Sequence, residues 1–474
     1  MKKIDLLICV KHMYTMTGEG VGYLADHGVA VDGGKIIAVE AIDVLKSEYT
    51  AEKLIESDKK VLLPGFIDGH MHAGHGVLRG VAQDINAWMM EGMAPFEAAR
   101  PQAAKDAGAR LAIAETIMAG TTTIGDDGTG MRGSLEFIEK AGVRGNVSVR
   151  VREAEQRSYK AGELYTFDPN YGQQTLNECL ELFDEFDGKD SGRIRVRFGP
   201  QGPDFLSYDL MVKIKELAKE RKSRIHMHLS QGSRETKQME MRYGSKSIPW
   251  LASKGYFDKD FTGIHLTDAT DEECKILADA GGRMVLCSSS IGIIDGEIPP
   301  AKMFQDHGGI CGLGSDQAPG NNCHNMFNEM KLTAILNKCR YHSSTDMPAW
   351  KVMRMATIEC ARALGIDDVT GSIEVGKDAD LILVDTHRTY LTPVYTVPMR
   401  NLIPNLVYSA RGDEVDTVIV QGRLIVEERK PLTFDVDEII DENQKWADEI
   451  GLAAKAQFEE INGANAQYMR EGKL

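Results

Sequence analysis

The chain has 474 residues, of which 42% are hydrophobic and 27% charged, a composition ordinary for a folded globular protein. Its 71 acidic residues outnumber 55 basic ones and give a formal net charge of -16, which disfavours nucleic acid or an anionic membrane as the main partner. No stretch is apolar over the roughly 18 residues that a membrane span needs, and no signal-peptide pattern is visible. The eight cysteines are scattered, as reduced thiols are, so we expect a cytoplasmic protein. With nucleic acid and membrane disfavoured, we expect a small-molecule substrate.

Both ends of the chain carry short β-strand patterns. Residues 1–60 contain β-branched runs broken by Asp32-Gly33-Gly34, a hairpin signal, and similar strand and turn patterns recur in residues 372–430. Because the first of these segments cannot close a core alone, we predict one small β-sandwich built from both termini. Residues 431–474 are acidic with a helical pattern, and we expect this extension to pack on the outside or on a partner subunit of a homo-oligomer.

Between residues 61 and 371, apolar strand patterns alternate with amphipathic helix patterns. This alternation predicts an α/β fold, a (β/α)8 barrel of the TIM type, whose chemistry lies at the C-terminal ends of its strands. The predicted strands are Leu62–Asp68, Thr121–Asp126, Gly145–Val151, Ile194–Gly199, Arg224–Leu229, Thr262–Leu266, Met284–Ser288 and Ile310–Ser315.

A pair of histidines ends the first of these strands. His70 and His72 are two residues apart, so along a strand both side chains point to the same face. Neutral imidazole is the commonest nitrogen ligand of zinc and iron in proteins. The pair therefore predicts half of a metal site.

Later strands end in further metal-capable side chains. The fifth ends with His226 and His228, the sixth with His265, and the eighth with Asp316. His228 lies nearer the C-terminal end of its strand and is the better ligand, whereas His226 is expected one layer deeper as a hydrogen-bonded core histidine. Four strands that all deliver such residues to one barrel mouth indicate a metal centre rather than chance packing.

A set of short motifs accompanies these strand ends. They are Pro64-Gly65-Phe66-Ile67-Asp68-Gly69-His70-Met71-His72, Leu78-Arg79-Gly80, Ala119-Gly120-Thr121-Thr122-Thr123, His228, His265, Gly314-Ser315-Asp316, Asn321-Asn322, Asn325-Met326 and Gly376-Lys377-Asp378-Ala379-Asp380-Leu381. With them the chain resembles the amidohydrolase superfamily, in its branch of single-metal aminohydrolases. That branch includes methylthioadenosine/adenosylhomocysteine deaminases, guanine deaminases and atrazine chlorohydrolase.

The resemblance implies roles for the strand-end residues. His70, His72, His228 and Asp316 would hold one divalent ion, with zinc favoured and iron as the alternative. His265 would hydrogen-bond the attacking water or approach the metal, and Asp316 would also take the proton of that water. Members with two ions carry a bridging lysine on the fourth strand, but residues 193–201 contain no lysine, so one ion is expected.

The chain departs from the branch at positions that matter for catalysis. Gln231 stands where family deaminases have a glutamate that shuttles a proton, and glutamine cannot carry one. Gln201 stands where the family has a substrate-contacting histidine, and the loop before Trp88 is shortened. We expect Gln201, Gln231, Trp88 and Asn322 to line the substrate.

These observations favour a metal-dependent hydrolase that attacks a small cyclic or heterocyclic nitrogen compound, with deamination as the leading reaction. Because Gln231 cannot act as an acid, hydrolytic dehalogenation or ring opening of a cyclic amide stays open as the alternative. A non-catalytic metal-binding homologue is a third possibility, which the intact pair of His265 and Asp316 disfavours.

Overall fold

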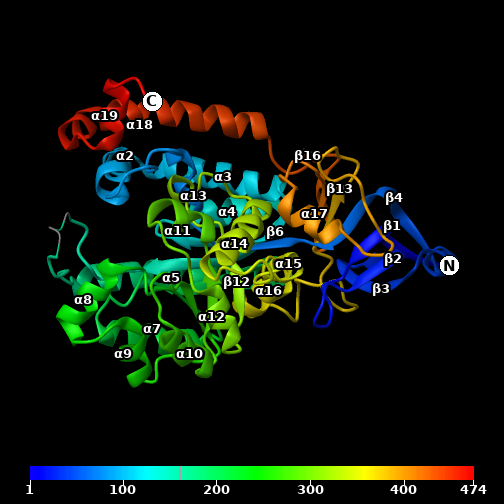
Figure 1. Ribbon diagram of the computed structural model, residues 1–474, viewed down its shortest axis with the longest axis horizontal. Coiled ribbons are helices and arrows are strands. Elements are labelled where there is room, and N and C mark those ends of the chain that lie inside the picture. The colour runs from blue at the N-terminus through cyan, green and yellow to red at the C-terminus, as the bar shows by residue number, and fades with distance from the viewer. Residues whose placement is uncertain (158, 160–161) are drawn as a thin grey trace.

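The computed structural model describes residues 1–157, 159 and 162–474, and it contains a parallel barrel joined to a separate sheet from the two termini (Figure 1). The barrel sheet runs β5 to β12 in chain order, which confirms the predicted (β/α)8 architecture. Its strands are β5 (Phe66–Met71), β6 (Thr121–Gly128), β7 (Arg144–Val151), β8 (Ile194–Pro200), β9 (Ile225–Leu229), β10 (Phe261–His265), β11 (Arg283–Leu286) and β12 (Cys311–Leu313).

The barrel closes between its first and last strands. Just beyond β12, Asp316 donates its backbone N–H to the carbonyl of His70 at 2.9 Å. The backbone N–H of His72 in turn donates to the carbonyl of Asp316 at 3.0 Å. Closure therefore occurs through the very residues that were predicted to form the site.

Helices surround the barrel and fill its connections. They are η1 (Ala73–Leu78), η2 (Trp88–Met93), α2 (Ala94–Ala99), α3 (Gln102–Met118), α4 (Arg132–Ala141), α5 (Pro169–Phe186), α6 (Lys189–Gly192), α7 (Tyr208–Glu220), α8 (Ser233–Tyr243), α9 (Ser247–Ser253), α10 (Asp271–Asp279), α11 (Ser288–Ile294), α12 (Ala301–Asp306), α13 (Ala318–Asn321), α14 (Met326–Arg340), α15 (Ala349–Met355) and α16 (Ile358–Leu364). Among the described helices, none is long and apolar enough to cross a membrane.

The first predicted strand is divided between two sheets. β4 (Tyr49–Pro64) belongs to the terminal sheet, and only from Phe66 onward does the chain enter the barrel. Gly65 makes the passage, because its N–H donates to the carbonyl of Asp380 and a side chain there would collide with Thr122. One continuous apolar run thus contributes to two hydrophobic cores, and the hydrophobic pattern alone does not show where the chain passes from one to the other.

Both termini share the second sheet, as predicted. Its order is β16-β15-β14-β13-β4-β1-β2-β3. The remaining elements are β1 (Lys2–Tyr14), β2 (Tyr23–Asp32), β3 (Lys35–Ala41), α1 (Ile42–Glu48), β13 (Leu381–Asp385), α17 (Leu402–Tyr408), β14 (Val415–Val420), β15 (Arg423–Glu427) and β16 (Lys430–Pro431). The sheet curls back on itself, since Ile36 near one edge donates to the carbonyl of Lys377 and packs with Ile419 from β14 in one apolar core.

An ion-pair cluster joins the terminal sheet to the N-terminal end of the barrel. Arg144 begins β7 and donates from Nη2 to Asp378 at 2.6 Å and from Nε to Asp380 at 2.8 Å. All three side chains are buried. The Gly-Lys-Asp-Ala-Asp motif therefore holds the two sheets together and lies on the face opposite the site.

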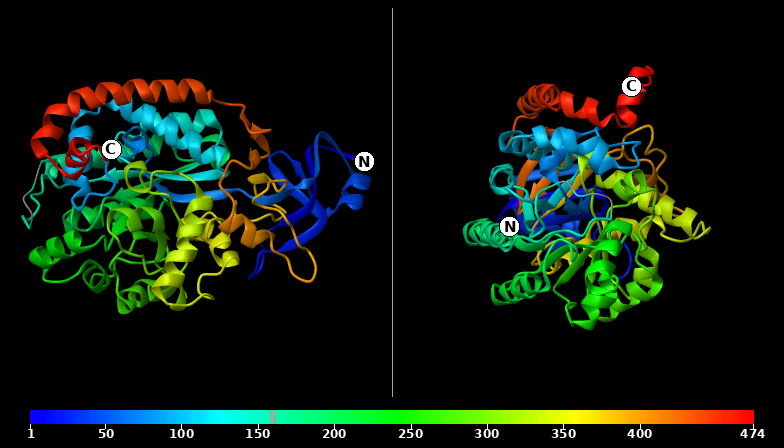
Figure 2. Two further views of the ribbon diagram at one scale, coloured as in Figure 1. Left: turned by 45° about the horizontal axis from the view of Figure 1, so that its top comes forward. Right: turned by 90° about the vertical axis from the view of Figure 1, so that its left-hand side faces the viewer.

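The C-terminal segment forms α18 (Val436–Ile461) and α19 (Ala464–Arg470). Figure 2 shows α18 lying along the outside of the barrel, over α2 and α3. Asn443 donates to the carbonyl of Ala107 at 3.0 Å, and Glu442 pairs with Arg110 at 2.6 Å. This helix thereby fixes the α2–α3 segment, which borders the barrel mouth.

Candidate active site

The predicted metal-capable side chains meet at the C-terminal mouth of the barrel. Ligand atoms of His70, His72 and His228 lie within 4.8 Å of one another, and so do those of His70, His265 and Asp316. All five side chains are buried. The structure therefore brings together residues from β5, β9, β10 and the segment after β12, as the strand-end argument predicted.

The backbone is strained where two of these side chains are presented. Asp316 has φ of 60° and His265 has φ of 72°, in the left-handed region that residues other than glycine seldom occupy. Such a conformation persists only where surrounding structure enforces it, and at Asp316 the backbone bonds to the β5 strand do so. Rigid presentation of this kind suits a preorganised site.

Nδ1 of His70, of His72 and of His228 is already engaged in a hydrogen bond. Nδ1 of His72 lies 2.8 Å from the carbonyl of Asp127, and Nδ1 of His228 lies 3.0 Å from the carbonyl of Gln201. Since a carbonyl only accepts, Nδ1 of His228 carries the proton and its Nε2 is free as a lone-pair donor. Nδ1 of His72 also lies 3.3 Å from Nη2 of Arg150, which only donates, but the shorter contact is with the carbonyl and favours the same tautomer as in His228. Nδ1 of His70 lies 2.9 Å from Nε2 of His226, an imidazole nitrogen that can accept a hydrogen bond when it is not protonated.

Burial sets the protonation of the cluster. Loss of solvent lowers the pKa of His70, His72 and His228 below the ordinary histidine value, and it lowers the pKa of His265 to about 3. These rings are therefore neutral, which is the form that binds a metal. Burial raises the pKa of Asp316, against the opposing effects of His72 and of the Ser290 hydroxyl, which donates at 2.5 Å.

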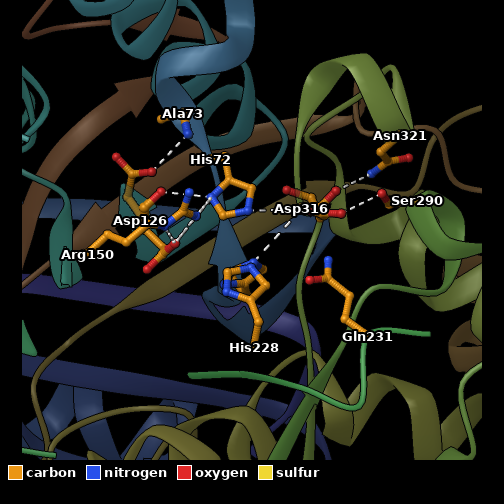
Figure 3. A network of polar contacts seen from close by, with 12 residues as sticks. His72, Ala73, Asp126, Arg150, His228, Gln231, Ser290, Asp316 and Asn321 are labelled. Atoms are coloured by element: carbon orange, nitrogen blue, oxygen red, sulfur yellow. Dashed lines mark hydrogen bonds and ion pairs between the residues drawn. The ribbon is translucent and has the colours of Figure 1, made fainter. Parts of the chain in front are cut away.

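The donor set fits a divalent cation. Among the described residues, Nε2 of His70 and both ring nitrogens of His265 are buried without a hydrogen-bond partner. Oδ1 of Asp316 lies 3.3 Å from Nε2 of His72 and 3.8 Å from Nε2 of His70. Figure 3 shows His72 and Asp316 facing each other. Unpaired buried nitrogens are costly, and a cation among neutral imidazoles and a carboxylate removes that cost.

An ion pair between Arg150 and Asp127 borders the histidine cluster, and it was not predicted from the sequence. Nε of Arg150 donates to Oδ2 of Asp127 at 3.0 Å, while the carbonyl of the same aspartate lies 2.8 Å from Nδ1 of His72. Burial raises the pKa of Asp127, but the charge and hydrogen bond of Arg150 together with His72 and His226 outweigh burial and hold that pKa below its ordinary value. Their positions could have indicated a role in the site, since both residues stand at the C-terminal ends of predicted strands.

Gln231 lies beside the cluster on the loop that leaves β9. Figure 3 shows its side-chain amide directed toward Asp316. The loop is fixed by Glu235, whose carboxylate accepts the backbone N–H of Ser230 at 2.8 Å and that of Gln231 at 2.9 Å. Oε1 of Gln231 is 3.4 Å from Nη2 of Arg234, so this amide has a cationic neighbour on one side.

The other predicted substrate contacts lie in different surroundings. Gln201 joins the site through its carbonyl, and its Oε1 is buried without a partner. Asn322 is exposed at the end of α13, whereas the buried Asn321 donates to the carbonyl of Ser315 at 2.8 Å and so steadies the Asp316 segment. Trp88 is half-buried at the start of η2. Substrate contact by these residues stays a prediction.

A parallel (β/α)8 barrel with histidines and an aspartate at the C-terminal ends of its strands is the arrangement of a metal-dependent hydrolase. The sequence comparison gives the family. Residues 61–425 match the amidohydrolase family, and the chain belongs to it. It is therefore a hydrolase that acts on carbon–nitrogen bonds.

Curated relatives match over nearly the whole chain. A 5'-deoxyadenosine deaminase of Methanococcoides burtonii is 31% identical over 449 residues, which cover 94% of this chain and 98% of that protein. A 5-methylthioadenosine/S-adenosylhomocysteine deaminase of Thermococcus onnurineus is 32% identical over 426 residues, covering 89% of this chain and 95% of its own length.

Solved structures agree with the fold. A zinc-bound adenosine deaminase from Xanthomonas campestris superposes with a TM-score of 0.86 at 26% identity, covering 95% of this chain and 99% of its own. An atrazine chlorohydrolase from Arthrobacter aurescens TC1, complexed with zinc, gives a TM-score of 0.82 at 20% identity, covering 93% of this chain and 100% of its own. At that identity the second likeness shows the fold alone.

Proposed function

We propose that the protein is a metal-dependent deaminase of a purine-type heterocycle, most closely an adenosine derivative. The observation that carries this proposal is the convergence of His70, His72, His228, His265 and Asp316 at one barrel mouth. The relatives that match over nearly the whole chain and are named as deaminases of adenosine derivatives support the choice of ring.

One ion would be held by Nε2 of His70, His72 and His228 together with Asp316. When bound, it supplies Lewis-acid activation of the attacking water. Zinc is the metal we propose, since neutral imidazole and carboxylate suit it and a structural relative was solved with zinc. We also propose a cytoplasmic homo-oligomer; the exposed Leu452 and Ile440 of α18 support a further contact surface, which light scattering on the purified protein would test.

Proton transfer falls to Asp316 and His265. Oδ1 of Asp316 can take a proton from the water, because Oδ2 is occupied by the Ser290 hydroxyl. Deamination moves two protons from water, one to the ring and one to the departing amine, and Asp316 can carry them in turn. His265 has two unpaired nitrogens and can donate its N–H to the oxygen that forms on the attacked carbon.

Gln231, on the loop that leaves β9, limits the proton transfers that the site can carry out. Its amide can donate to a ring nitrogen or a carbonyl but cannot protonate either. This observation keeps a second candidate, namely hydrolytic loss of halide or opening of a cyclic amide, which makes a weaker demand for an acid at that position.

A substrate panel tests the proposal. The zinc-loaded enzyme is incubated with 5'-deoxyadenosine, 5'-methylthioadenosine, adenosine, guanine and a chlorotriazine, and ammonia and chloride are measured against loss of substrate. Stoichiometric ammonia from at least one purine supports deamination. Chloride release or ring opening without ammonia would replace it with the second candidate, and no product from any compound would contradict both.

A further inference from the structure

A small cavity opens beside the histidine cluster. Its volume is about 150 Å³, and its wall includes His72, Arg100, Lys105, Asp127, Arg152 and Gln201. Because His72 and Gln201 also belong to the histidine cluster and its hydrogen bonds, the cavity adjoins the site where the reacting ring would lie. It is bordered by α3 on one side and by the ends of β7 and β8 on the other.

The charges that line this cavity are mostly positive. Arg150 is paired with Asp127, and Arg100 is paired with Glu97 at 2.6 Å, so these four groups nearly cancel. Two further cations, Lys105 and Arg152, have no carboxylate partner within the described part of the chain. A concentrated positive charge is unexpected in a protein whose formal net charge is -16.

Neutral groups hold the two unpaired cations. Nζ of Lys105 donates to the carbonyl of Thr129 and, at 3.2 Å, to its hydroxyl. Nε of Arg152 donates to the carbonyl of Ala154 at 3.0 Å, and its guanidinium lies 4.8 Å from the ring centre of Phe205. These contacts orient both side chains without neutralising them, so each keeps N–H groups for a further partner.

Two more observations indicate a ligand. Oε1 of Gln201 is buried against the cavity without a hydrogen-bond partner, and a turn of this amide would present its NH₂ group there instead. Burial and repulsion from Arg100 and Arg150 lower the pKa of Lys105 to about 8, although the charges of Glu97 and Asp126 act in the opposite direction. An anion in the cavity would accept hydrogen bonds from the NH₂ group of the turned Gln201 amide and from Nζ of Lys105.

Size limits the occupant. Pockets for whole drug-sized ligands are about 300–1,000 Å³, so about 150 Å³ accommodates a compact group and not a nucleoside. We propose that this cavity binds an anionic group of the substrate, a carboxylate or a phosphate, through Lys105 and Arg152, while the ring lies over the histidine cluster. The inference rests on the proposed function for the position of the ring, but binding of the anion can be measured without turnover.

The test is calorimetric titration of the zinc-loaded protein with inorganic phosphate, and separately with acetate, at fixed pH and ionic strength. Wild type is compared with Lys105→Met and Arg152→Met, and with Lys331→Met, which removes an exposed lysine on α14 as a matched control. Loss of one charge-assisted hydrogen bond should weaken Kd by about tenfold or more. Phosphate that binds only at the zinc would be unaffected by either cavity variant and would overturn the proposal.

Two further arms keep the result decisive. Lys105→Arg and Arg152→Lys retain the charge and should retain most of the affinity for the anion. Zinc content and the circular dichroism spectrum of every variant show whether it is folded. Failure of wild type to bind either anion would also overturn the proposal. If adenosine is turned over, adenosine 5'-phosphate is compared with it, and the cavity variants should raise KM for the phosphate only. Absence of ammonia from every purine of the panel would contradict the proposed function and leave the binding result standing.

Discussion

His226 stands behind His70, with its Nε2 2.9 Å from Nδ1 of His70. The two rings are nearly parallel at a centroid distance of 5.1 Å, and burial lowers the pKa of His226 to about 4, so it is neutral. If His226 accepts this hydrogen bond, the proton is placed on Nδ1 of His70 and Nε2 is free for the metal. The bond therefore selects the tautomer that a ligand needs.

The first prediction follows from this bond. His226→Leu should weaken zinc binding about 10- to 100-fold, the usual loss when the partner of a ligating histidine is removed. His226→Gln, whose amide oxygen can accept the same hydrogen bond, should recover part of that loss. Zinc Kd is measured by competition with a chelator, and an unchanged Kd in the leucine variant would show that His226 only fills space.

The second prediction concerns the link between the two sheets. Arg144→Ala leaves Asp378 and Asp380 without their arginine, and removal of one partner from a buried ion pair costs about 3–5 kcal/mol of unfolding free energy. Denaturant unfolding of the metal-loaded protein measures the loss. Arg132→Ala, which breaks an exposed ion pair with Glu185, is the control and should change stability by about 1 kcal/mol or less.

The same link has a defined pH dependence. Burial raises the pKa of Asp378, but the hydrogen bond from Lys35 and the charge of Arg144 outweigh burial and lower it below the ordinary value. A lowered folded-state pKa contributes stability above the unfolded-state pKa, and that contribution is lost as pH falls through the folded-state value. The difference in unfolding free energy between wild type and Arg144→Ala should therefore be largest near pH 7 and become smaller below about pH 4. A difference that grew on acidification would contradict this assignment.

Much of the fold and of the site was predictable because both follow from simple periodicities. Alternating strand and helix patterns gave the barrel, and spacing of two along a strand placed His70 beside His72. The passage from β4 to β5 was missed because the apolar run is continuous across Gly65. The ion pair of Asp127 with Arg150 was missed, and so were the two cavity cations Lys105 and Arg152. Their roles depend on which charges are already paired, and the sequence does not show this pairing.

The third prediction concerns Gln231. Gln231→Ala should cut turnover about 10²- to 10³-fold if the amide donates to the reacting group in the transition state. Gln231→Glu should also impair turnover, because Arg234 at 3.4 Å from the present amide oxygen favours an ionised carboxylate that cannot donate. Steady-state rates across pH measure both effects. Full activity of the alanine variant would make the position a bystander, and equal or better activity of the glutamate variant would show a deaminase that lacks its usual acid.

The fourth prediction concerns the domain organisation, with the barrel at 61–371 and the shared sheet from 1–60 and 372–430. Deletion of residues 1–55 removes β1, β2 and β3 and exposes the core that Leu381 and Ile419 share with them. We expect an insoluble or strongly destabilised chain. A truncated protein that remained soluble, metal-loaded and active would show that the N-terminal strands are dispensable.

The central claim is that one metal ion is held by His70, His72, His228 and Asp316 at the barrel mouth. The most direct test is elemental analysis of purified wild type, His228→Ala and, as a control, His387→Ala, whose histidine is exposed and distant in sequence from every strand end of the site. We predict one divalent ion per chain in wild type and in the control, and almost none in His228→Ala at an unchanged circular dichroism spectrum. Two ions per chain in wild type, or a full complement of metal in His228→Ala, would contradict the account.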